Sequence, residues 1–470
     1  MPIGSCRLRS LTLALSSILA AGAANAATIT VTTVEDGSVA GECTLRDAIL
    51  SANGNVASGN CEAGEAGHDD IVFAPGVTGT ILLTGGQLET TEEASITGPG
   101  ADNLTIDAQG NSRVLKVSND ESTTTTLTGL TFTGGRTTAE SEGGGAISCL
   151  SALNLIDSVI TGNSTAGESS PGGGLFTATT TNLTRTKVTN NWTEAYGSLA
   201  GGMIVVFGLA NLIDSTISGN WTEGDTAGGG GIVVFWGWFD ATLVNSTVSG
   251  NATYGNNSQA GGLAAGGSAF LINSTVSGNA THGTSDAEFN DAGGLSVSGS
   301  VTLTNSTIVD NVSEFGGVAI NLANPDTTIL SATNTLIANT VDGAPALCSK
   351  AIDSAGSHNL ATDISCGTDT LVGGAPASSS ALALGALADN GGPTETHALL
   401  AGSVAIDAAD ATACAADPID DLDQRGQPRP IDGNGDGDAV CDIGAYEAVD
   451  TDAIFRDGFE APAARARLSD

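Results

Sequence analysis

The chain has 470 residues, and its 52 acidic side chains outnumber its 14 basic ones, for a net charge of −38. This balance argues against binding to nucleic acid or to acidic lipid, both of which attract basic surfaces. Sixty-five glycines and few aromatic residues favour tight turns and small stacked side chains over one large globular core.

Residues 1–26 are typical of a secretory signal peptide. Arg7 and Arg9 form the positive start, an apolar run follows from Leu11 to Ala23, and Ala-Asn-Ala at 24–26 is the small-residue cleavage site. The apolar run is too short to span a bilayer, and no later segment is apolar enough to do so. We therefore expect a protein that is secreted or held at the cell surface, with no membrane span.

Residues 27–70 predict an N-terminal cap with a strand over 29–33 and a short helix over 43–55. Most cysteines lie outside the repeats that follow. Their positions suggest three disulfides, although sequence alone leaves the connectivity open: Cys43 with Cys61, Cys348 with Cys366, and Cys414 with Cys441. Cys149 is left over, and we interpret it as a small buried apolar residue.

Residues 71–345 are built from a repeat best seen in LINSTVSGN (271–279), whose copies end 28 to 32 residues apart. Apolar and polar residues alternate within each copy, and a second short apolar run opens with glycines, as in GGGGIVV (228–234). Strand, turn, strand and turn in this length form one coil of a stacked repeat protein. The sequence predicts an all-β fold, a right-handed parallel β-helix (solenoid) of roughly ten coils.

The repeat register predicts columns of like residues. The last Asn of each copy should stack into a ladder and hold a left-handed bend; these are Asn163, Asn191, Asn220, Asn251, Asn279, Asn311 and Asn339. Six residues earlier, Asp157, Arg185 and Asp214 fall on successive coils. They form either a salt-bridge ladder or part of a catalytic carboxylate group, for which Asp240 is the third weak candidate.

Tryptophans provide a second candidate surface. Trp192 and Trp221 each follow a ladder Asn in adjacent coils, whereas Trp236 and Trp238 lie in a bulging turn. Aromatic side chains on a rod either bind sugar rings or a protein partner, or they shield the coil edges by stacking on one another.

Several blocks resemble known families of exported bacterial proteins. CTLRDAI (43–49) resembles the CSLREA-type N-terminal domain, and the repeats over 143–340 resemble those of polymorphic outer-membrane proteins. Residues 346–449 are similar to the choice-of-anchor Q domain, through ALADNGGPTETHALLAGSVAIDA (386–408), DQRGQPRP (423–430) and CDIGAYE (441–447). These resemblances imply export, a β-helix, a C-terminal cap, and adhesion or surface display.

Two features lie at the C-terminal end. The loop over 431–442 alternates oxygen-bearing side chains with glycines, which is either a calcium site or a solvated acidic turn; the candidate ligands are Asp432, Asn434, Asp436, Asp438 and Asp442. The tail over 450–470 contains IFRDGFE (454–460), which resembles a short motif that follows such caps and is a candidate sorting or processing signal.

The sequence therefore predicts an exported, non-catalytic rod for adhesion, or for binding a polysaccharide or a surface protein along its length. The alternative is a carbohydrate-active enzyme, a polysaccharide hydrolase or lyase on the same fold. A lyase acting on uronates needs a cation and a base, yet no Lys or Arg occurs between Val188 and Ser349. Three carboxylates gathered in one cleft would favour the enzyme.

Overall fold

A computed structural model describes residues 26–449, except Trp236 and residues 285–290, 315–316, 341–344 and 354–356. The predicted signal peptide, apart from Ala26, and the predicted tail over 450–470 lie outside the described residues. Within the described part, no helix is long and apolar enough to cross a membrane.

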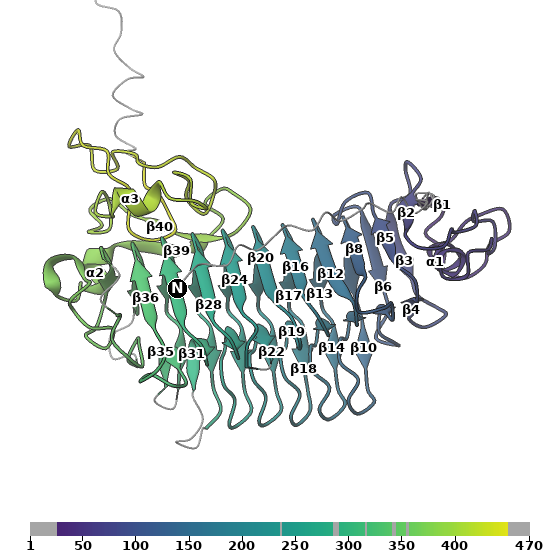
Figure 1. The fold of residues 1–470 in the computed structure, drawn as a ribbon, viewed down its shortest axis with the longest axis horizontal. Helices are drawn as coiled ribbons and strands as arrows, with labels where there is room; N and C mark the ends of the chain where they lie inside the picture. Colours follow the sequence, from purple (N-terminus) through teal and green to yellow (C-terminus); the bar gives the residue numbers. More distant parts are fainter. Residues whose placement is uncertain are drawn as a thin grey trace, which may run out of the picture.

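Two eleven-stranded parallel sheets form most of the rod (Figure 1). Sheet A contains β1 (Ala27–Val31), β2 (Asp69–Phe73), β5 (Ala94–Thr97), β8 (Thr124–Thr128), β12 (Ala152–Ile156), β16 (Thr181–Thr184), β20 (Ala210–Ile213), β24 (Ala241–Val244), β28 (Ala269–Ile272), β32 (Val301–Thr304) and β36 (Leu330–Thr333). Sheet B contains β3 (Gly79–Leu82), β6 (Leu104–Asp107), β9 (Thr131–Thr133), β13 (Val159–Thr161), β17 (Lys187–Thr189), β21 (Thr216–Ser218), β25 (Thr247–Ser249), β29 (Thr275–Ser277), β33 (Thr307–Val309), β37 (Leu336–Ala338) and β38 (Leu360–Ala361).

Two shorter parallel sheets close the coils. Sheet C contains β4 (Leu88–Thr90), β7 (Leu115–Val117), β11 (Ile147–Cys149), β15 (Leu175–Thr177), β19 (Met203–Val205), β23 (Ile232–Val234), β27 (Leu263–Ala265), β31 (Ala292–Val297) and β35 (Val318–Leu322). Sheet D contains β10 (Arg136–Thr137), β14 (Ser164–Thr165), β18 (Trp192–Thr193), β22 (Trp221–Thr222), β26 (Ala252–Thr253), β30 (Ala280–Thr281) and β34 (Val312–Ser313). One coil runs through sheets A, B, D and C before the next begins. The predicted all-β parallel β-helix is therefore confirmed.

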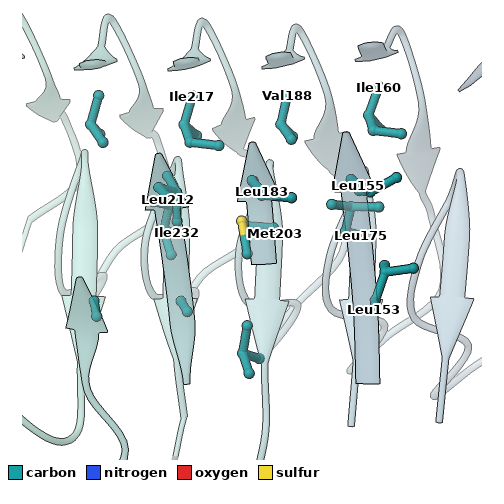
Figure 2. Packing of buried hydrophobic residues seen from close by; sticks show 14 of the residues in the cluster. Leu153, Leu155, Ile160, Leu175, Leu183, Val188, Met203, Leu212, Ile217 and Ile232 are labelled. Carbon is teal, nitrogen blue, oxygen red and sulfur yellow. The ribbon is translucent and has the colours of Figure 1, made fainter. Parts of the chain in front are cut away.

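The core is a set of apolar columns inside the rod. Alternate residues of each strand point inward, so like residues of neighbouring coils meet in register, as Leu155, Leu183 and Leu212 do in sheet A. Figure 2 shows this stacking, with a second column of Ile160, Val188 and Ile217 from sheet B. These side chains are fully buried.

The predicted Asn ladder is confirmed from Asn163 to Asn311. At each step the backbone N–H and the side-chain amide of one Asn donate to Oδ1 of the next, as from Asn220 to Asn251 at 3.0 and 2.9 Å. Asn339 does not continue the ladder, and its side chain donates to Pro345 instead. The reason is that the chain leaves the repeat here, since β38 joins sheet B and no further sheet D strand is described.

The predicted left-handed bend was wrong in position. Positive φ angles of 46° to 51° occur at the turn between sheets A and B, six residues before the ladder position at Asp157, Arg185, Asp214, Asn245, Asn273 and Asn305, and five residues before it at Asn334. At the ladder turn itself, the residue before the Asn takes this conformation, for example Gly219 with φ 62°. A glycine absorbs the bend without a Cβ clash, which leaves the Asn free to direct its amide along the column.

The N-terminal end is closed by α1 (Leu45–Gly54). Thr44 caps its N-terminus, and Leu45, Ala48 and Ile49 pack into the main core. The strand before it, predicted over 29–33, is β1, which pairs with β2 and so already belongs to sheet A. The first coil of the rod therefore begins inside the segment predicted as a separate cap.

The three suggested disulfides are present, joining Cys43 to Cys61, Cys348 to Cys366 and Cys414 to Cys441. Cys149 is unpaired and buried, as expected. Burial raises the pKa of its thiol to about 11, so it is protonated at neutral pH and unsuited to nucleophilic chemistry.

The C-terminal region divides into two parts. Leu347, Cys348, Ala361 and Cys366 join the main core and close the end of the rod, followed by η1 (Val372–Gly374). Residues 378–449, here called the side domain, lie along the flank of the rod beside sheet B (Figure 1). The side domain contains α2 (Ser379–Leu382), an antiparallel pair of β39 (Leu384–Ala388) and β40 (Thr396–Leu399), and α3 (Ala411–Cys414).

Polar contacts attach the side domain to sheet B. The side chain of Gln424 is buried, donates to Oγ1 of Thr247 at 2.8 Å and accepts from Oγ1 of Thr275 at 2.6 Å. His397 contacts Ser277 at 2.8 Å. The side domain therefore covers the C-terminal half of sheet B and leaves the N-terminal half open.

Candidate functional site

The three candidate catalytic carboxylates do not share a site. Asp157 accepts two hydrogen bonds from Arg185, at 2.6 and 2.9 Å, and this contact lowers the pKa of the carboxyl. Asp214 lies on the coil after Arg185 and accepts from Asn245 at 3.2 Å. Asp240 precedes β24, at the opposite end of the sheet A strands, and accepts from the backbone of Ser268. Asp157 and Arg185 therefore form a salt bridge between neighbouring coils, whereas Asp214 is hydrogen-bonded to Asn245.

Trp192 and Trp221 stack on each other, as expected from their register. Their ring centroids are 5.1 Å apart at an angle of 4°, and their indole N–H groups donate to Glu194 and Glu223. Because each ring covers one face of the other, only one face of each remains for a sugar ring. This favours the interpretation that the pair shields the edge of sheet D.

Trp238 lies elsewhere, in the turn between sheets C and A. Its side chain is 91% exposed, and Trp236 beside it lies outside the described residues. Three more apolar side chains are exposed in the same turn of this coil and of the coil before it: Phe207 at 60%, Leu209 at 39% and Phe235 at 39%. We call Phe207, Leu209, Phe235 and Trp238 the aromatic edge. Trp238 thus lies apart from Trp192 and Trp221, in agreement with the two clusters that the sequence predicts.

A shallow hollow adjoins the aromatic edge over sheet C. Its volume is about 190 Å³, and Phe235, Val233, Gln259 and Ala264 are among the residues that line it. The hollow gives the aromatic edge a concave side, which an isolated exposed ring would lack.

The outer side of sheet A is a flat surface that the sequence analysis did not single out. From β8 to β36, two outward rows carry no charged residue: Thr126, Asn154, Asn182, Asn211, Thr242, Phe270, Thr302 and Ser331 in one, and Thr128, Ile156, Thr184, Ile213, Val244, Ile272, Thr304 and Thr333 in the other. We call these sixteen residues the uncharged face; eight strands span about 35 Å. All are at least partly exposed.

The uncharged face is rigid as well as flat. Asn182 donates to Asn154 at 2.8 Å and Asn211 donates to Asn182 at 2.9 Å, so a second amide ladder runs along the surface. β-branched neighbours have few rotamers to lose on binding. Every second residue of a sheet A strand belongs to this face. The uncharged face could therefore have been predicted from the alternation of residues along the strands.

A third surface lies where the side domain meets the open half of sheet B. A hollow of about 300 Å³, here called the corner hollow, is lined by Lys187, Thr189 and Ser218 from the rod and by Asp389 and Glu395 from the side domain. Lys187 is one of the few cations in the rod, and it is exposed.

The predicted calcium ligands do not converge. Asp432 accepts from the backbone N–H groups of Gly435 and Gly437, and Asn434 and Asp436 each accept from the backbone two residues on. Asp442 is buried and accepts from the N–H groups of Asp407 and Ala448. Among residues 26–449, as far as described, no group of three His, Cys, Asp or Glu side chains is arranged to hold a metal. Calcium binding stays a prediction.

Asp442 instead belongs to a buried ion cluster in the side domain. The cluster contains Asp423, Arg425, Arg429, Asp442 and Glu447. None of these side chains is more than 8% exposed. Arg425 pairs with Asp423 at 2.6 Å and lies over the ring of Tyr446, while Arg429 donates to the carbonyls of Asp442 and Gly444. Burial raises the pKa of Asp442 to about 7 and that of Glu447 to about 8. These contacts join the predicted blocks 423–430 and 441–447.

Comparison with known proteins gives little further guidance. No protein-family model matches the chain, and a search of curated proteins finds no match. Among solved structures, the chain is similar to one described as "Crystal structure of pectate lyase Pel9A", at 13% sequence identity and a TM-score of 0.43, covering 91% of this chain and 98% of that chain. The parallel registers themselves define this chain as a parallel β-solenoid protein. The resemblances to the CSLREA-type, polymorphic outer-membrane and choice-of-anchor Q families stay predictions.

Proposed function

We propose that this protein is an exported, non-catalytic rod that binds an uncharged, extended polysaccharide across the outer side of sheet A. One observation carries the proposal: sixteen outward positions of the uncharged face hold no charge in a chain whose net charge is −38. Charged side chains are the ordinary occupants of a solvated surface, so a long surface without them suits an uncharged ligand.

The composition of the uncharged face fits sugar chemistry. Ile156, Ile213 and Val244 offer apolar contacts for the C–H faces of sugar rings, and the neighbouring Asn and Thr side chains offer donors and acceptors for hydroxyl groups. The aromatic edge lies just before the same strands, where Trp238 has both ring faces available for stacking. An acidic polymer is disfavoured because the protein repels it.

A location at the cell exterior would suit the same role. Three disulfides suit an oxidising compartment, and the resemblances of the N-terminal block, the repeats and the side domain to families of surface proteins imply display or adhesion. A rod that presents one long binding face is suited to attachment along a polymer.

The proposal is tested by binding to insoluble neutral polysaccharides, with the chain from residue 27 onward. Ile213→Asp and Thr184→Asp place charge in the middle of the uncharged face, and we expect each to weaken binding at least tenfold. Thr189→Asp on the open half of sheet B is the matched control and should bind as the wild type does. Equal binding by all three variants would show that sheet A is not the binding face.

Salt dependence separates this mode from charge-driven adhesion to a surface protein. Binding through uncharged groups should change less than twofold between about 0.05 and 0.5 M salt, because no charge pairs are screened. Binding that falls steeply with salt would identify a charged partner and contradict the proposal.

A carbohydrate-active enzyme is the second candidate, and the corner hollow is the observation that favours it. The ammonium group of Lys187 supplies the cation that a lyase needs beside a substrate carboxylate, and Asp389 and Glu395 supply the two carboxylates that a hydrolase requires. Release of reducing ends or of unsaturated products from neutral and acidic polysaccharides, with and without calcium, tests this candidate. Activity that is lost in Lys187→Ala or Glu395→Gln would support the enzyme.

A further inference from the structure

The side domain contains a cavity of about 620 Å³, twice the volume of the corner hollow. Leu399, Leu400, Ile406 and Ala448 line it together with the ring of Tyr446. This volume falls within the range of about 300 to 1,000 Å³ that is typical of pockets that bury a ligand. Leu400 is nevertheless 49% exposed, so the apolar lining is open to solvent.

The C-terminal tail of the chain is a candidate occupant of the cavity, because the last described residue lies at its wall. Val449, the last described residue, is itself part of the lining and is 45% exposed. Twenty-one residues follow it, and their large apolar side chains are concentrated in Ile454, Phe455 and Phe459. The next segment of the chain thus starts at the mouth of the cavity and brings apolar groups of its own.

We propose that Ile454 and Phe455 of the same chain occupy this cavity. Ile454 is five positions after Val449 in the chain, which allows a reach of up to about 17 Å.

Docking of the tail would control access to the segment 454–460. A segment whose apolar residues are buried is protected from cleavage, since a protease needs an extended and accessible chain. The side domain would then act as a receptor for its own C-terminal segment and determine when that segment can be processed.

The test uses the chain from residue 27 to 470. Ala401→Trp fills the cavity from its exposed rim and should release the tail, so that trypsin cleaves after Arg456 at least tenfold faster than in the wild type. Ala386→Trp, on an exposed position of β39 that does not line the cavity, is the matched control and should leave the rate unchanged.

A second measurement protects the test against misfolding of the Trp variant. The double variant Ile454→Ser with Phe455→Ser removes the docking groups without touching the cavity, and hydrogen exchange of the amides over 398–406 should then be at least fivefold faster. Equal exchange in wild type and double variant, with equal cleavage in Ala401→Trp, would overturn the proposal. Protection that depends on protein concentration would also overturn it, because the tail would then dock on a second copy.

Discussion

The rod and the side domain bury polar groups in opposite ways. In the repeats of the rod, buried amides recur from coil to coil, so each Asn of the ladder satisfies the next. In the side domain, five charged groups are buried together in a single cluster around Arg429 and Glu447. A repeat distributes the cost of burying polar groups evenly over many coils, whereas an irregular domain concentrates it in one cluster.

The largest effect should come from breaking the buried ion cluster. Arg429→Ala removes a guanidinium that is fully buried and leaves the carboxyl groups of Asp442 and Glu447 without their cation. We expect the side domain to lose about 4 kcal/mol of stability. Urea unfolding with pulse proteolysis, followed by detection of the surviving fragment, measures the loss.

The rod should not be affected by this change. The inner core of the rod is a cluster separate from that of the side domain, which packs Leu399 and Ile443 against Val309 and Leu336 on the outer side of sheet B. The rod fragment should therefore survive to the same urea concentration in the variant and the wild type. A parallel loss of rod stability would mean that the two regions unfold as one unit.

The next effect should come from the buried ladder of the rod. Asn220→Ala leaves the backbone N–H of Asn191 without its acceptor and the carbonyl of Val188 without its side-chain donor in the interior. We expect a loss of about 3 kcal/mol, because buried polar groups without partners cost more than a hydrogen bond contributes. Asn182→Ala, in the exposed amide ladder of the uncharged face, is the control and should cost about 0.5 kcal/mol. Denaturant titration of both variants measures the difference.

The side domain should respond to pH where the rod does not. Three carboxyl groups face two guanidinium groups in the buried cluster, so one carboxyl retains its proton in the fold. The pKa values are raised by burial, to about 7 for Asp442 and about 8 for Glu447, so the neutral forms stabilise the fold. This stability is fully present below the ordinary carboxyl pKa and is lost as the pH rises through 7 and 8.

We therefore expect the side domain to be about 2 kcal/mol less stable at pH 9 than at pH 5. Differential scanning calorimetry across this range follows its transition. Glu447→Gln is permanently neutral and should flatten the dependence. A side domain that becomes more stable with rising pH would show that the pair is ionised in the fold.

The repeat made the rod predictable from sequence. The sequence of each coil contains its own alternation of apolar and polar residues. The register of Asn220, Asn251 and Asn279 therefore follows from local patterns alone. The left-handed bend was assigned to the wrong residue because both the Asp214 position and the ladder position hold residues that tolerate it. The two positions differ in that the side-chain amide at the ladder position donates to the Asn of the next coil.

The position of the side domain was not predictable in this way. Gln424 contacts Thr247 and Thr275, which are 177 and 149 residues away in the chain. These threonines occupy the same repeat position as Lys187, which is exposed, so nothing local marks the covered half of sheet B. The acidic loop illustrates the same limit, because burial of Asp442 depends on partners outside the loop.

The smallest effect should come from the exposed counterpart of the buried cluster. Arg185 pairs with Asp157 at 2.6 Å, the same distance as Arg425 with Asp423, but both partners of the first pair are about half exposed. Water screens this attraction, so Arg185→Ala should change rod stability by about 0.5 kcal/mol or less in denaturant titration. Its effect should shrink further in high salt, whereas that of Arg429→Ala should not. Burial, rather than the length of the contact, then determines how much an ion pair contributes in this molecule.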